Sequence, residues 1–216
     1  MREWDGESFS TLFAAPCDAD VAYALAQVLL GFEGFAAAEP TRAAEVKPTG
    51  VVDFRRVVLG DLHVDGAVDM HDHEAVIILG DLHANTVSAD ETGYVVVAGT
   101  IRARTVYSDG NLLAGNVEAP LAVGEYPDGI LGVAGTIRAG LAYVSEHILV
   151  AGAIDAEFVH NDSTFGGPNY DGQRSRGLKD LTARLPPSYV DSADEDDPVR
   201  ISALLEHVEA GGSPFA

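Results

Sequence analysis

The feature that most constrains the fold is a short phrase written six times between residues 51 and 160. Each copy has an apolar run, then a glycine, then a polar residue between two apolar ones. The copies are VVLGDLHVDGAV, VIILGDLHANTV, YVVVAGTIRARTV, NLLAGNVEAPLAV, LGVAGTIRAGLAY and ILVAGAIDAEFVH, with glycines Gly60, Gly80, Gly99, Gly115, Gly135 and Gly152. Successive glycines are 16 to 20 residues apart. A period of this length indicates a repeat architecture.

Alignment on the glycine gives three columns of different chemistry. The second residue after it is always aliphatic: Leu62, Leu82, Ile101, Val117, Ile137 and Ile154. The third is always polar: His63, His83, Arg102, Glu118, Arg138 and Asp155. The fourth is small or aliphatic: Val64, Ala84, Ala103, Ala119, Ala139 and Ala156. Alternation of apolar and polar residues is typical of a strand with one buried face.

One copy cannot bury its own apolar row, whereas stacked copies join their rows into a continuous core. The sequence therefore predicts a mainly β fold: a parallel, right-handed β-helix or solenoid of about six turns over residues 51–160. The glycine is expected at a tight corner that needs either positive φ or close backbone approach. Which side chains of the run before the glycine point inward stays open, because a corner can shift the phase.

The two termini are predicted to be helical caps over the open ends of the solenoid, whose edge strands would otherwise invite aggregation. Residues 1–50 are read as an N-terminal cap and linker, with a helix over 18–31 and the linker over 39–50. Residues 161–216 are read as a C-terminal loop and helix, with Asp197 as N-cap and Pro198 at the first helical position. The helical stripes are Val21, Leu25, Val28 and Leu29, and Ile201, Leu204, Leu205 and Val208.

The charge of the chain limits its partners. Thirty-four acidic and 13 basic residues give a formal net charge of −21. Such a chain repels nucleic acid and anionic membranes and attracts cationic proteins; the simpler reading is solubility or a high-salt habitat. Cys17 is the only cysteine, so neither an internal disulfide nor a cysteine zinc site is possible. The N-terminal residues lack a signal-peptide pattern, and no apolar run approaches a membrane span, which predicts a cytoplasmic protein.

The histidines are the candidate metal ligands. His63 and His83 share a column, so stacking would bring them about 4.8 Å apart. His71 and His73 lie on the loop between them, and Asp61 and Asp81 form a second polar column. Imidazoles and carboxylates at such distances can bind Zn²⁺ or Ni²⁺. The alternative is a solvent-facing polar ladder that continues into Arg102, and because the repeat itself produces the spacing, we predict neither metal nor cofactor.

Acidic loops between the turns are the candidate partner-binding sites, because insertions in repeat proteins often form the binding face. The residues concerned are Asp69, Asp72, Glu74, Asp90 and Glu91. A catalytic set is not found: the chain has no GxSxG elbow and no GxxxxGK[ST] loop. A pairing of Cys17 with His147 or His160 has no geometric support, so we predict no enzymatic activity.

The repeated phrase resembles the repeats of bactofilin-type polymer-forming proteins and their bacterial β-helical relatives. The resemblance covers residues 51–160 and is carried by VVLGDLHVDG, VIILGDLHAN, VVVAGTIRAR and ILVAGAIDAE. It implies a right-handed β-helix without enzymatic activity or cofactor, and bactofilins assemble end to end into filaments. Folded termini, such as LKDLTARLPPSYVD with its following helix, depart from that pattern and would oppose filament growth. The layout is also similar to solenoid proteins that accompany secreted toxins.

Three functions follow as hypotheses. The first is a non-enzymatic acidic binding protein, such as an immunity protein that neutralises a cationic toxin. The second is a polymer-forming, bactofilin-like cytoskeletal scaffold whose partner is itself. The third is a metal-dependent enzyme that uses His63, His71, His73 and His83.

Overall fold

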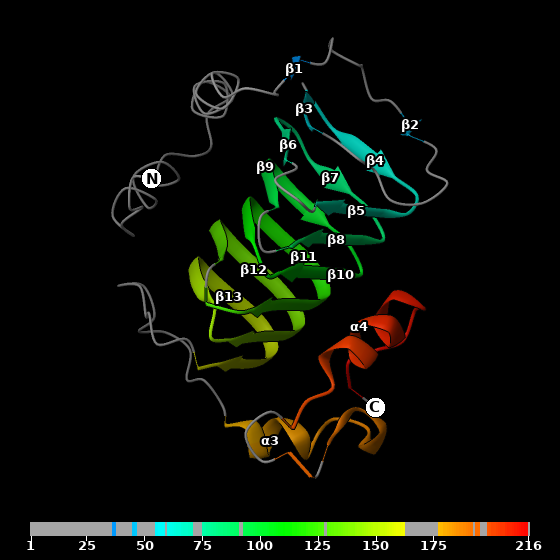
Figure 1. Ribbon diagram of the computed structural model, residues 1–216, viewed down its shortest axis with the longest axis vertical. Helices are drawn as coiled ribbons and strands as arrows, with labels where there is room; N and C mark the ends of the chain where they lie inside the picture. The colour runs from blue at the N-terminus through cyan, green and yellow to red at the C-terminus, as the bar shows by residue number, and fades with distance from the viewer. Residues whose placement is uncertain are drawn as a thin grey trace.

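The chain forms a parallel β-solenoid, as the repeat predicts (Figure 1). A computed structural model describes residues 36–37, 45–46, 55–58, 60–70, 75–90, 93–127, 129–162, 177–191, 193–194 and 198–215. Its early strands are short: β1 (Ala36–Ala37), β2 (Glu45–Val46), β3 (Arg55–Val58), β4 (Leu62–Val64), β5 (Ala67–Met70), β6 (Ala75–Ile78), β7 (Leu82–His83) and β8 (Thr86–Ala89). The later ones lengthen: β9 (Tyr94–Arg102), β10 (Thr105–Ser108), β11 (Asn111–Glu125), β12 (Ile130–Ser145) and β13 (Ile148–Asn161). The helices are α3 (Leu178–Thr182), the 3-10 helix η1 (Pro187–Tyr189) and α4 (Ile201–Glu209).

The predicted columns are confirmed by the strand register. The aliphatic column is in register from Leu62 through Leu82, Ile101, Val117 and Ile137 to Ile154. The polar column is in register from His63 to Asp155 in the same way. Since every pairing between turns is parallel and keeps these columns aligned, each column becomes a continuous row along the solenoid.

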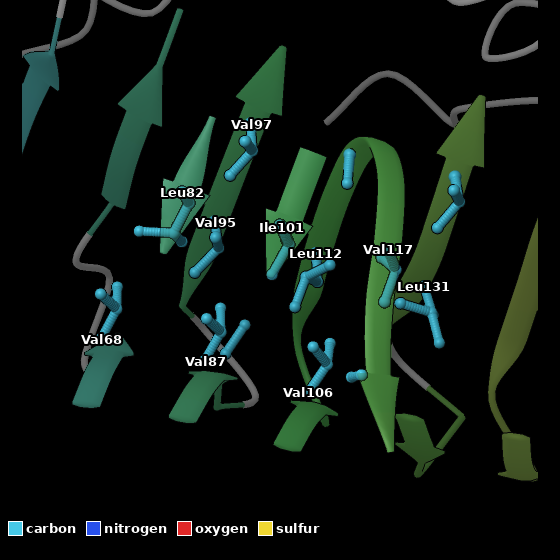
Figure 2. Close-up of a cluster of buried hydrophobic side chains, with 14 of the residues drawn as sticks. Val68, Leu82, Val87, Val95, Val97, Ile101, Val106, Leu112, Val117 and Leu131 are labelled. Carbon is cyan, nitrogen blue, oxygen red and sulfur yellow. The ribbon is translucent and has the colours of Figure 1, made fainter. Parts of the chain in front are cut away.

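The interior also contains every second residue of the run before the glycine, which settles the phase that the sequence left open. Val95 and Val97 point inward with Ile101, and the third strand of the turn adds Val106 (Figure 2). Figure 2 shows these side chains meeting those of the neighbouring turns in one core. Burying a Val, Leu or Ile side chain stabilises a fold by about 1.5–3 kcal/mol, so this row is the main source of stability.

The corner glycines are required mainly for close approach. Gly60 has φ of +129°, a conformation that residues with a side chain rarely adopt. At Gly115 and Gly152 a Cβ would lie only 2.5 Å from the carbonyl oxygens of Ala98 and Ala134, one turn below. At Gly99 it would overlap the carboxylate of Asp81. Both predicted reasons for a corner glycine therefore occur, and contact with the previous turn is the more frequent one.

The C-terminal helices cover one side of the solenoid rather than its end. Helix α4 packs against β10 and β11, and α3 packs against β13 (Figure 1). The outward positions beneath them are polar in the early turns, at Thr86 and Ser88, and become apolar at Leu121 and Val123. The chain places its helices over the turns whose outer surface is apolar, where a second cluster forms from Leu121, Val123, Leu141, Tyr143, Phe158, Leu181, Leu185, Val199, Ile201, Leu204 and Val208.

The prediction of the C-terminal helix is confirmed for its buried apolar residues, but it is wrong for the residue at which the helix begins. Ile201, Leu204 and Val208 are buried, as expected. The helix begins at Ile201 with Arg200 as N-cap, not at Asp197 and Pro198. The cause is Val199, which is buried and forms an antiparallel bridge with Val190, and this keeps the chain extended there.

Two further predictions concern the N-terminal side. The solenoid has about five turns, not six; its first turn, β3 to β5, is made of short strands and includes residues outside the described part. The predicted helix over 18–31 also lies outside the described residues, as does most of the predicted linker over 39–50. The described residues before position 51 form β1, which pairs with β3, and β2, which pairs with β4, so the parallel ladder extends before residue 51.

Replacement of Gly99 tests the close approach at the corner. We expect Gly99→Ala to lower the free energy of unfolding by about 1–3 kcal/mol, because the added methyl group must displace Asp81 or the turn below. Gly177→Ala is the matched control, since a Cβ there meets nothing within 4 Å. Urea titration of both variants measures the difference, and equal stabilities would contradict the packing argument.

Candidate functional site

The candidate site is one outer face of the solenoid, formed by β4, β7, the C-terminal end of β9 and the middle of β11, β12 and β13. His63 on β4 and the flanking Asp61 and Asp65 are all exposed. We call this surface the polar face. Its three columns hold Asp61, Asp81, Thr100, Asn116 and Thr136; His63, His83, Arg102, Glu118, Arg138 and Asp155; and Asp65, Asn85 and Arg104.

The central column carries a ladder of ion pairs. Arg102 donates from Nη1 to Asp81 Oδ2 at 2.6 Å and from Nε to Glu118 Oε2 at 3.1 Å. Arg138 Nη1 donates to Glu118 Oε1 at 3.0 Å. Side chains exposed to this degree, 35 to 61%, gain little net stability from pairing. The ladder confirms the predicted polar ladder on a solvated surface and leaves these charges paired with one another.

The aspartates after the glycines bind backbone. Asp61 Oδ1 accepts the Asp81 N–H at 2.8 Å, and Asp81 Oδ1 accepts the Thr100 N–H at 2.8 Å. Asn116 repeats the contact with the Thr136 N–H at 3.0 Å. The missing Cβ of the next glycine leaves room for the carboxylate, which explains why Gly and Asp recur together. The Thr100 backbone hydrogen bond, followed by that from Arg102, lowers the pKa of Asp81 below its usual value.

The predicted approach of His63 and His83 is confirmed. Their rings stack with centroids 4.3 Å apart and planes 7° apart. In parallel rings the nitrogen lone pairs point in parallel directions, whereas ligands of one metal ion must converge on it. Within the described residues, no group of three or more His, Cys, Asp or Glu side chains could hold a metal ion. His71 and His73, the other two candidates, lie outside that part of the chain.

A shallow hollow of about 540 Å³ runs beside the histidine stack. Its lining combines carboxylate, imidazole, amide and guanidinium groups: His63, Val64, Asp65, His83, Ala84, Asn85, Arg102, Ala103, Arg104 and Glu118. The small side chains Ala84 and Ala103 produce the depression between two rows of polar ones. These groups can bind a polar or charged side chain by hydrogen bonds and ion pairs, and the lining includes neither a serine nor a cysteine nucleophile.

The acidic loops are described only in part. Asp69 is half-buried and accepts a hydrogen bond from Ser88 Oγ, its neighbour in the next turn. This carboxylate therefore links two successive turns of the solenoid. Asp90 is exposed. Asp72, Glu74 and Glu91 lie outside the described residues, so their role as partner-binding groups stays a prediction.

A Ser–His pair that the sequence did not reveal lies inside the solenoid. Ser108 Oγ is 3.1 Å from His147 Nε2, and His147 Nδ1 donates to the Tyr126 carbonyl at 2.8 Å. Both side chains are fully buried, so a substrate cannot reach them in this conformation. Gly124 and Gly129 provide the space that the imidazole occupies. No motif joins positions 39 residues apart, and only the fold brings them together.

The pairing of Cys17 with a histidine, for which the sequence gives no geometric support, is not tested by the structure. His160 is buried and lies 3.8 Å from Asp162 Oδ2 and against the Tyr143 ring, on the side that the C-terminal helices cover. Cys17 lies outside the described residues.

Comparisons with known proteins leave the resemblance to bactofilins as a hypothesis. A scan against protein-family models, a search of curated proteins and a search of solved structures each found no match. None of the helices in the described residues is long and apolar enough to cross a membrane. The fold and the geometry of the polar face therefore carry the functional argument.

Two replacements of Asp81 separate a structural role from a ligand role. Asp81→Asn keeps an oxygen that can accept the Thr100 N–H, as Asn116 does elsewhere in the column. We expect Asp81→Ala to lower the free energy of unfolding by about 1 kcal/mol more than Asp81→Asn, because it leaves that N–H without its acceptor. Chemical denaturation measures both, and an Asn variant as unstable as the Ala variant would contradict the role.

The pH dependence of stability tests the buried His147. Burial lowers the pKa of this imidazole, since charging it inside the solenoid is costly. The unfolded chain therefore binds the proton more readily, and stability falls as the pH drops below about 6.5. We expect His147→Gln to show a smaller fall than the wild type in denaturation measured from pH 8 to pH 5. Identical slopes would show that His147 does not carry the effect.

Proposed function

We propose that this protein is a non-enzymatic binding protein whose polar face docks a cationic protein partner. The observation that supports this is the net charge of −21, combined with the pairing of Arg102, Arg138, Arg184 and Arg200 with carboxylates of the same chain. A rigid acidic surface attracts basic proteins from a distance and speeds their association.

Four arginines of the described surface pair with carboxylates of the same chain, which reduces the attraction that these arginines exert on an anionic partner. Arg102 and Arg138 are held by carboxylates of the ladder. Arg184 pairs with Glu157, and Arg200 pairs with Asp191 at 3.2 Å. These guanidinium groups are therefore already engaged and offer little attraction to an anionic partner, while exposed carboxylates outnumber them.

The early turns of the polar face are the proposed centre of docking. Asp61 and Asp65 are exposed on either side of His63, and neither pairs with a cation in the described part of the chain. These carboxylates directly flank β4, whose register in the ladder is fixed, so we expect little conformational freedom to be lost when a partner binds. An Arg or Lys side chain of the partner would enter the adjoining hollow, where Asp65 would accept its hydrogen bonds.

In its narrower form, the proposal is an immunity protein that neutralises a toxin by covering a basic active site. The charge, the preorganised surface and the polar hollow without a nucleophile are consistent with that role. A cytoplasmic protein that resembles toxin-associated solenoids would act where its cognate toxin is made.

Self-assembly is the second candidate. It is favoured by the last turn, where Ile154 is only half-buried while Ile137, one turn earlier, is fully buried. The interior row thus reaches an end that another copy could extend. Filaments in negative-stain images at high protein concentration would favour this scaffold over the first proposal.

Neutralising variants of the polar face test the docking proposal. The partner tested is the product of the reading frame beside the gene for this chain. We expect Asp61→Asn/Asp65→Asn to weaken its binding several-fold in calorimetry at low salt, and the wild-type affinity to fall as the ionic strength rises to about 0.15 M.

Asp180→Asn/Glu206→Gln is the matched control. It removes the same number of charges from exposed positions on α3 and α4 and should leave binding nearly unchanged. Equal losses in the two double variants would contradict the polar face as the docking site. Tight binding that salt does not affect would contradict the electrostatic basis.

A further inference from the structure

One arginine of the polar face does not take part in the ion-pair ladder. Among the arginines whose side chains the structure describes, those that pair with a carboxylate are Arg102, Arg138, Arg184 and Arg200. Arg104 is exposed and forms no ion pair within the described residues, although it lines the hollow beside Arg102. Its N–H donors therefore stay open to a partner on a face whose other arginines are already engaged.

The C-terminal end of α4 borders this side chain. Helix α4 lies beside β10 (Figure 1), and Glu209 Oε1 accepts a hydrogen bond from the buried Thr105 Oγ1 at 3.2 Å. Gly211 follows the helix with φ of +101°, and a Cβ there would lie 3.2 Å from Arg104 Nη1. The guanidinium thus lies against the end of α4, where the helix dipole favours a cation. Because this contact orders Arg104 before a partner arrives, less conformational freedom is lost on binding.

The column that contains Arg104 changes its charge along the solenoid. The strand register gives Asp65, Asn85 and Arg104 equivalent positions in three successive turns. The Arg104 N–H donates to the Asn85 carbonyl at 2.9 Å, which agrees with this alignment. All three residues line the hollow. Strands lie about 4.8 Å apart, so a carboxylate position and a guanidinium position stand about 10 Å apart with an amide between them.

We infer that Arg104 is a specificity-determining residue of the docking site and binds a carboxylate of the partner protein. This inference rests on the proposed function: Asp65 would bind an Arg or Lys of the partner, and Arg104 would bind an Asp or Glu beside it. A planar guanidinium binds a carboxylate through two parallel hydrogen bonds, which favours one orientation of the partner. The inferred partner is a cationic protein that presents an acidic side chain within its basic docking surface.

Such a contact would separate the cognate partner from other basic proteins. The net charge of −21 attracts any polycation, and long-range attraction alone does not select one of them. A basic surface without a carboxylate would bring its own Arg or Lys groups close to Arg104 and leave that guanidinium unpaired at the interface. Proximity of like charges opposes binding, so Arg104 would act against the wrong partners as well as in favour of the right one.

Removal of the Arg104 charge tests the inference through the sign of its effect. Binding of the product of the adjacent reading frame is measured by calorimetry at low salt for the wild type, Arg104→Gln and Lys179→Gln. Lys179 is exposed on α3 and does not line the hollow, so it is the matched control for the loss of one positive charge. Long-range attraction alone predicts that both variants bind the cationic partner at least as tightly as the wild type. We expect Arg104→Gln to bind several-fold more weakly, and Lys179→Gln to bind at least as tightly as the wild type.

A double-mutant cycle identifies the group that Arg104 binds. Each exposed Asp or Glu of the partner is replaced in turn by Asn or Gln, and each variant is measured against the wild type and against Arg104→Gln. One replacement should weaken binding to the wild type several-fold and cause no further loss with Arg104→Gln. Urea denaturation should give nearly equal midpoints for the wild type and Arg104→Gln, because an exposed side chain without an ion pair contributes little to stability.

The outcomes separate this inference from the docking proposal on which it rests. Unchanged or tighter binding by Arg104→Gln, or additive losses at every carboxylate of the partner, would overturn the inference and leave the docking proposal standing. Absence of binding by the wild type, or equal losses in Asp61→Asn/Asp65→Asn and its control, would overturn the docking proposal and the inference with it.

Discussion

The structure depends on the close approach of successive turns at the glycine corners. A parallel ladder places each residue about 4.8 Å from its equivalent in the next turn, so each side chain must be compatible with the equivalent side chains above and below it. In the aliphatic rows the equivalent side chains pack against one another. In the polar row neighbouring side chains of opposite charge form ion pairs, as Arg102 and Glu118 do. At the corner, where a Cβ cannot fit, glycine admits the carboxylate of Asp61 or Asp81, which binds a backbone N–H.

The three outer sides of the solenoid have different chemistry and therefore different roles. The polar face is solvated and carries Asp61 and Asp65, neither of which forms an ion pair within the described residues, so it is the side proposed for recognition. The side beneath α3 and α4 changes from Thr86 to Leu121 along the stack, and the helices cover its apolar part. The outer side of β6 and β9 is apolar at Ile77 and Val96. Helices α3 and α4 thus lie on a side other than the polar face.

Much of the fold could be predicted because equivalent residues align in sequence as they do in space. The columns of Leu62 and His63 were correct through Ile154 and Asp155, since a parallel stack preserves the period. The phase of the strand before each glycine could not be read, because the corner interrupts the alternation. The chain is extended at Val199 because this residue forms a bridge with Val190 in an earlier segment. The sequence around Val199 does not reveal that bridge, so the predicted first residue of α4 was wrong. The Ser108–His147 contact, likewise, has no local sequence signal, whereas the His63–His83 stack follows from the period itself.

The in-register stacking has a consequence for how such a chain can change over evolution. Because strands pair only with those of the turns beside them, a whole repeat away from the turns that α3 and α4 cover can be duplicated or deleted while the aliphatic column of the interior stays in register. Loss or gain of fewer residues than a repeat would shift a strand and exchange its inner and outer sides. The length of the solenoid, and with it the area of its recognition surface, is thus free to vary in steps of one turn.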